Sequence, residues 1–162
     1  MSFFPNEEDR RRAVHEHLED VLETLPWVAA IDRFQHWVYE HPGHNEEERR
    51  QAWTGIFTSF SDSVTDWSGL EDGRDYLWQK QLHLYEVPFY YIEYGMAQLG
   101  AIALWRNYNR NHSETLEAYF NALKLGNTRT IPDVYQAAGI RFDFQPAYIR
   151  ELMAFVEKEL AR

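Results

Sequence analysis

One histidine and three tyrosines lie close together in the sequence, and their side chains can hold a peptide through neutral hydrogen bonds. They are His83, Tyr90, Tyr91 and Tyr94. On an α-helix each residue turns by about 100°, so Tyr90 and Tyr94 would lie within about 20° of His83. Tyr91 would lie further round, at about 80°. Such a row suits a developing oxyanion or the carbonyl groups of an extended peptide. Pro88 predicts a kink between His83 and Tyr90.

A second interpretation makes the same segment an aromatic core helix. A row of tyrosines on a helix is most often packed in the interior of a protein. Small residues that allow close packing of a buried helix follow the tyrosines, namely Gly95, Ala97, Gly100, Ala101 and Ala103. The residue types alone leave both interpretations open.

The stretch from His83 to Gln98 resembles the C-terminal part of oligoendopeptidase F, a thimet-type zinc metallopeptidase. The similar residues are His83, the run 88–92 with the sequence Pro-Phe-Tyr-Tyr-Ile, Tyr94, and Ala97 with Gln98. Further similar segments, at 25–29, 34–37, 39–42, 123–126 and 137–140, extend the resemblance over essentially the whole chain.

The resemblance implies a role for each of the four residues. His83, Tyr90 and Tyr94 would contact the substrate peptide and stabilise the tetrahedral intermediate, and Tyr91 would be a further substrate-binding residue. It also implies the C-terminal lobe of a thimet-oligopeptidase-like catalytic domain, short peptides as substrates, and zinc as the cofactor of the complete enzyme.

The zinc motif of this family, His-Glu-x-x-His on a helix, is missing from the sequence. The nearest run has His15 and His17 only two residues apart, and these would point in nearly opposite directions from a helix. His36, His41 and His44 lie near one Pro-Gly loop with Glu40, and we expect an adventitious metal or none there. We therefore expect the C-terminal segment of a longer enzyme, inactive alone, with its metal on a complementary segment.

Hydrophobic periodicity of 3.6 residues runs through nearly the whole chain. It predicts helices over about 6–25, 27–38, 45–60, 76–108, 113–126, 130–139 and 147–160, with Pro26 and Pro88 as interruptions. No strand pattern of useful length appears. The prediction is an all-α, compact bundle of about six or seven helices that forms a single domain over residues 1–162.

Composition excludes several classes of protein. The 162 residues carry a formal net charge of −10 and contain no cysteine. A disulfide scaffold and a thiolate zinc site are thereby excluded, and binding to nucleic acid or to a membrane is not expected. The acidic N-terminus is unlike a signal peptide, so we expect a cytoplasmic protein.

Aromatic residues make up 16% of the chain. This content suits either a heavily packed helical core or a surface that recognises a peptide or another subunit. It leaves open a second function, a non-catalytic helical interaction or dimerisation module.

Overall fold

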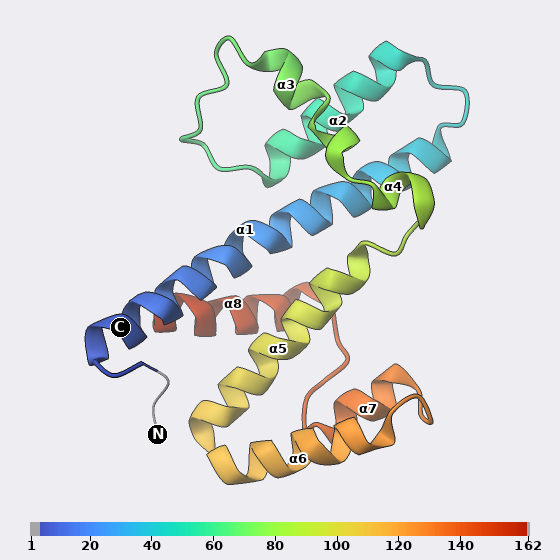
Figure 1. Cartoon of the computed structure of the whole chain (residues 1–162). Helices are drawn as coiled ribbons and strands as arrows, with labels where there is room; N and C mark the ends of the chain where they lie inside the picture. The colour runs from blue at the N-terminus through green and yellow to red at the C-terminus, as the bar shows by residue number, and fades with distance from the viewer. Residues whose placement is uncertain (1–3, 162) are drawn as a thin grey trace. The chain divides into compact units, whose positions relative to one another are not determined.

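The computed structural model describes residues 4–161, and these form eight α-helices, one 3-10 helix and no strand (Figure 1). The all-α prediction is therefore confirmed. The elements are α1 (Glu7–Glu40), α2 (Glu46–Phe60), α3 (Glu71–Asp75), η1 (Leu77–Lys80), α4 (His83–Glu86), α5 (Ile92–Arg110), α6 (His112–Leu125), α7 (Ile131–Ala137) and α8 (Pro146–Leu160). They divide into two compact units. Unit 1 contains the described residues up to Leu18 and from Met96 onwards, and unit 2 is Glu19–Gly95.

Unit 2 is built around an aromatic core that joins α1 and α2. Its centre is formed by Ile31, Phe34 and Trp53, each at most 1% exposed. The Trp53 ring lies 5.2 Å from Phe34 and 5.8 Å from Trp27, both in edge-to-face arrangements. The indole N–H of Trp53 donates to the carbonyl of Arg74 at 2.8 Å, which ties α3 to this core.

Unit 1 has its own buried residues along α5 to α8. Figure 1 shows α6 and α7 lying side by side, joined by a short turn. Arg106 of α5 and Glu151 of α8 form an ion pair at 2.7 Å, and the Trp105 and Phe155 rings pack edge to face at 5.2 Å. Ion pairing and ring packing together hold α5 and α8 in contact.

The break expected at Pro26 does not occur. Helix α1 continues from Glu7 to Glu40 with Pro26 inside it. A proline within a helix costs one backbone hydrogen bond, about 3 kcal/mol. The buried stripe of Val21, Val28 and Ile31 runs past the proline on both sides. Burial of this stripe offsets the loss and keeps the helix continuous.

The long helix expected over 76–108 is wrong for its first half. The chain there forms η1 and α4, and a continuous helix begins only at Ile92. Val87, directly before Pro88, has φ −138° and ψ 76°, since a residue before proline is pushed out of the helical region. The helical-wheel angles given above for His83 therefore do not describe this segment.

Side chains three residues apart cap several helices. Asn45 and Glu48 form a capping box at α2. Thr130 and Asp133 form another at α7. Helix α6 begins at His112 with Asn111 as its cap, just before the start at 113 that the sequence predicts. No helix within residues 4–161 is both long and apolar enough to cross a membrane.

Candidate functional site

The four residues singled out in the sequence lie together in unit 2. Measured between ring centroids, His83 is 6.1 Å from Tyr90, 4.9 Å from Tyr91 and 5.5 Å from Tyr94. The His83 and Tyr90 rings are parallel, and the Tyr94 ring is nearly perpendicular to His83. We call these four residues the His–Tyr cluster. A turn and two helix ends bring them together, rather than one face of a single helix.

A tight turn places Tyr90 in the cluster. The Tyr90 N–H donates to the carbonyl of Val87 at 3.2 Å, with Pro88 and Phe89 at the two central positions. Phe89 has φ 61°, and it is the one residue other than glycine with positive φ among the described residues. Proline followed by positive φ is the pattern of a type II turn, which normally places glycine or asparagine at the second position. The cluster is thus held by a strained backbone.

Contacts from α1 hold this strained turn. The Phe89 N–H donates to Gln35 Oε1 at 2.9 Å, and the Gln35 side chain is only 3% exposed. The Phe89 ring lies 4.9 Å from His36 and 5.0 Å from Tyr39. A buried acceptor and two ring contacts together compensate for the unfavourable backbone conformation of Phe89.

The first turn of α5 places Tyr94 through a close approach to α1. The next residue, Gly95, is buried, and a Cβ there would lie 3.1 Å from Val28 Cγ1. Glycine therefore allows the start of α5 to lie against α1. The Tyr94 side chain is left at the rim of the contact, where its hydroxyl is 3.2 Å from His83 Nε2.

Exposure separates the two interpretations of the tyrosines. Tyr90 is 42% exposed and Tyr94 is 45% exposed, so the core-helix interpretation is wrong for both. Tyr91 packs against the aromatic core of unit 2 and is only partly exposed. Burial raises the pKa of the Tyr91 phenol, while a hydrogen bond from Trp27 opposes this rise. Tyr90 and Tyr94 are therefore accessible, while Tyr91 packs against the aromatic core.

Sequence patterns missed three residues that support the cluster. Gln81 Nε2 lies 2.6 Å from His83 Nδ1, and Gln81 Oε1 accepts from the indole N–H of Trp27 at 3.2 Å. Gln35 holds Phe89, as described above. Trp27 and Gln35 are each 54 residues from their partners, so periodicity cannot connect them. Gln81 is two residues from His83, but glutamine in a polar stretch gives no signal by itself.

Two of the three histidines considered as metal ligands contact backbone carbonyls instead, and the third contacts a carboxylate. His41 Nδ1 lies 2.8 Å from the carbonyl of Trp37, and His44 Nδ1 contacts the carbonyl of His41. His36 pairs with Asp32 at 3.5 Å. Within residues 4–161, no three or more His, Asp or Glu side chains are grouped so that they could hold a metal ion. The described residues therefore do not fit the zinc site that the resemblance implies for the complete enzyme.

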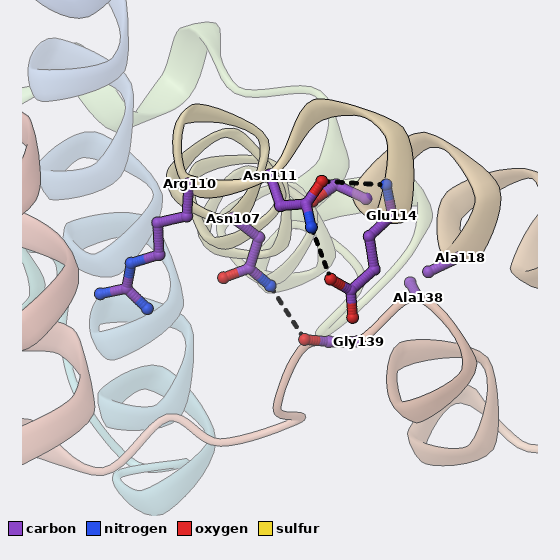
Figure 2. A pocket seen from close by; sticks show the side chains of 8 residues that line it. Asn107, Arg110, Asn111, Glu114, Ala118, Ala138 and Gly139 are labelled. Atoms are coloured by element: carbon purple, nitrogen blue, oxygen red, sulfur yellow. Dashed lines mark hydrogen bonds between the residues drawn. The ribbon is translucent and has the colours of Figure 1, made fainter.

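A polar pocket of about 230 Å³ lies in unit 1, where α5 ends and α6 begins (Figure 2). Asn107 Nδ2 donates to the carbonyl of Gly139 at 2.9 Å, and Asn111 Nδ2 donates to Glu114 at 2.8 Å. The Arg110 side chain points away from these pairs in Figure 2. The two amides are already used to hold helix ends, so the His–Tyr cluster is the stronger candidate site.

The model of peptidase family M3 matches residues 2–154. The comparison with curated protein sequences gives no match. Among solved structures, an oligoendopeptidase F is 31% identical with a TM-score of 0.80, covering 95% of this chain and 27% of its own. PZ peptidase A, solved with an inhibitor, is 31% identical with a TM-score of 0.81, covering 96% and 28%.

A third similar structure is an oligoendopeptidase F from Bacillus anthracis strain Ames. It is 28% identical with a TM-score of 0.70, and the match covers 96% of this chain and 24% of that protein. The chain thus spans about a quarter of the length of the structures it matches.

Proposed function

The chain belongs to peptidase family M3, and we propose that it forms part of the substrate-binding wall of a zinc metallo-oligoendopeptidase of the cytoplasm. In this proposal His83, Tyr90 and Tyr94 form hydrogen bonds with a short peptide and with the oxyanion that develops at its cleaved bond. Tyr91 supports them from the aromatic core.

One observation carries the proposal. The accessible Tyr90 and Tyr94 rings both face the same imidazole, and Tyr94 Oη lies 3.2 Å from His83 Nε2. Two accessible phenol rings thus lie against one imidazole. Neutral donors suit a carbonyl oxygen and its developing negative charge. Removing one such donor from an oxyanion site typically costs about 2.7–4 kcal/mol of transition-state stabilisation.

The metal ion lies outside the role proposed for this chain. Zinc, where bound, supplies a Lewis acid and an activated water in enzymes of this kind. We assign its ligands to a complementary segment, and the residues described here bind and orient the peptide.

Titration with a short, unstructured peptide tests the binding role. With the chain isotopically labelled, we expect ring signals of His83, Tyr90 and Tyr94 to shift on addition of the peptide. The double variant Tyr90→Phe with Tyr94→Phe should weaken binding, because it removes both hydroxyls and leaves the rings. Tyr119→Phe, which changes an exposed tyrosine of α6 in unit 1, is the matched control. Binding that the double variant leaves unchanged would contradict the proposal.

Hydrolysis tests the assignment of the metal to another segment. The purified 162-residue chain should cleave no short peptide, with or without added zinc. Zinc-dependent cleavage that a chelator abolishes would show that this chain carries its own metal centre.

An exposed apolar face favours a second function, a helical interaction or dimerisation module. On α6, four large side chains at helical spacing are 38–56% exposed, namely Leu116, Tyr119, Phe120 and Leu123. Such a face is typical of a surface that another helix covers. Size-exclusion chromatography with light scattering over a range of concentrations tests it. A strict monomer at high concentration excludes self-association through α6.

A further inference from the structure

The imidazole of His83 is the centre of a chain of side-chain hydrogen bonds that begins in the aromatic core. Trp27 Nε1 donates to Gln81 Oε1 at 3.2 Å, and Gln81 Nε2 lies 2.6 Å from His83 Nδ1. On the other side of the ring, His83 Nε2 lies 3.2 Å from Tyr94 Oη. Every polar atom of the imidazole thus has a partner.

The direction of this chain follows from the chemistry of its first member. An indole N–H can only donate, so the oxygen of the Gln81 amide must face Trp27. The amide NH₂ then faces His83 Nδ1, and NH₂ can only donate. His83 Nδ1 must accept, which leaves the proton of the neutral ring on Nε2. The indole donor fixes the orientation of the Gln81 amide, and the ring orientation that places Nδ1 toward Gln81 is the one that gives both ring nitrogens a partner.

The indole that sets this direction is itself firmly held. Edge-to-face contacts place the Trp27 ring 5.8 Å from Trp53 and 6.4 Å from Phe57. Lys80 Nζ lies 4.4 Å from the centre of the Trp27 ring. The Tyr91 hydroxyl is a second acceptor near the indole N–H. Trp27 remains a donor whichever oxygen accepts its hydrogen. The direction of the hydrogen-bond series from Trp27 to Tyr94 is therefore unchanged.

We propose that Gln81, oriented by Trp27, is a positioning residue that fixes His83 as the Nε2–H tautomer and thereby makes the Tyr94 hydroxyl a donor toward the ligand. With its proton on Nε2, His83 donates to Tyr94 Oη. The hydroxyl proton of Tyr94 is then directed elsewhere, and a peptide carbonyl is the acceptor it suits. This inference rests on the proposed function. It adds Gln81 as the residue that decides which side chain of the cluster donates and which accepts.

Nitrogen NMR of the labelled chain measures the tautomer directly. Spectra are recorded near pH 9. His83→Gln identifies the His83 signals among the seven histidines. We expect Nδ1 to resonate as an unprotonated nitrogen and Nε2 as a protonated one. A wild-type His83 with its proton on Nδ1 would overturn the inference.

Substitution of Gln81 should change this result in a defined direction. In Gln81→Glu the carboxylate accepts from both Trp27 and His83, so the proton should move to Nδ1. In Gln81→Met neither bond remains, and both tautomers should be populated. Gln79→Glu makes the same chemical change at an exposed position two residues away and should leave the tautomer unchanged. An unchanged tautomer in both Gln81 variants would contradict the inference.

Peptide affinity separates this inference from the proposed function. In Gln81→Glu the Tyr94 hydroxyl must donate to His83, so affinity for the short peptide should fall about threefold to tenfold. In a Tyr94→Phe background, Gln81→Glu should have no further effect. If the tautomer inverts but the wild type binds no peptide, the proposed function fails and only the role of Gln81 in fixing the His83 tautomer stands. If binding depends on Tyr94 but the tautomer does not invert, the inference fails alone.

Discussion

The His–Tyr cluster and the α6–α7 region both consist of short helical segments joined by turns, but their turns are made differently. In the α6–α7 region the positive φ angles fall on Gly126 and Gly139, where they cost little. In the cluster the positive φ falls on Phe89. The α6–α7 region therefore follows local conformational preferences, and the cluster departs from them.

The hydrogen bonds of the two regions differ in the same way. The caps at Asn111 and Thr130 pair with residues three positions away. The bonds that hold the cluster, from Trp27 to Gln81 and from Phe89 to Gln35, join residues 54 positions apart. Strain held by distant contacts is typical of functional sites, where geometry takes precedence over stability. The comparison thus supports the cluster as the functional part of this chain.

The largest effect is expected where the aromatic core supports the cluster. Trp53→Ala should lower the free energy of unfolding by about 3–5 kcal/mol, because it opens a cavity and leaves the carbonyl of Arg74 without its donor. Chemical denaturation measures the loss. Trp53→Phe keeps part of the ring packing and should cost less. Equal losses in both variants would mean that the indole N–H, rather than ring packing, dominates.

A buried carboxylate in unit 2 should be nearly as important. Asp75 is 3% exposed and accepts hydrogen bonds from Arg50, Arg74 and Thr54. Asp75→Asn removes the negative charge that faces Arg50 and Arg74. Both arginines are partly exposed, so we expect a loss of about 1.5–3 kcal/mol, the usual range for hydrogen bonds to charged groups. Thermal and chemical denaturation at neutral pH test this. A loss below 1 kcal/mol would contradict the view that this network is essential.

The same carboxylate predicts a pH dependence. Burial alone would raise the pKa of Asp75, but its hydrogen bonds from Arg74, Thr54 and Arg50 bring it below the ordinary value. The stabilisation is therefore complete above the unfolded-state pKa, about 3.9, and is lost as the pH falls below it. A hydrogen bond from Arg50 lowers the pKa of Glu47 to about 2, and Glu47 contributes to the same loss. The free energy of unfolding, measured from pH 6 to pH 2, should fall less steeply in Asp75→Asn than in the unsubstituted chain. In Glu47→Gln the part of the fall that is due to Asp75 should remain.

A smaller effect on stability is expected at Gln35, with a large effect on the cluster. Gln35→Leu removes the acceptor of the Phe89 N–H and should cost about 0.5–1.5 kcal/mol, the usual net value of one hydrogen bond. The strained turn should then relax, so the ring signals of Tyr90 should shift or broaden. A normal spectrum of Tyr90 in this variant would show that ring contacts alone hold Phe89.

The sequence predicted more of the fold than of the candidate site, because it reveals local interactions and hides contacts between distant residues. Helix periodicity depends on residues three or four positions apart, and most of the helices that it predicts are confirmed. The sequence also identified His83, Tyr90 and Tyr94 as neighbours. Their continuous helix was wrong, because Pro88 sets a turn whose second central residue, Phe89, is stabilised only by tertiary contacts. The bond between Trp27 and Gln81 could not be found, since it joins residues 54 positions apart through the folded core.

The smallest effect should arise in the α6–α7 region, where the structure is local. Thr130→Ala removes the side chain that caps α7 and should cost about 1 kcal/mol, while Thr130→Ser keeps the hydroxyl and most of the stability. Because the Thr130 cap is a local interaction, we expect the ring signals of His83 and Tyr94 to be unchanged in both variants. NMR spectra recorded alongside denaturation curves check this. Shifted cluster signals in Thr130→Ala would show that the two regions are coupled, and the contrast between a local region and a tertiary one would then need revision.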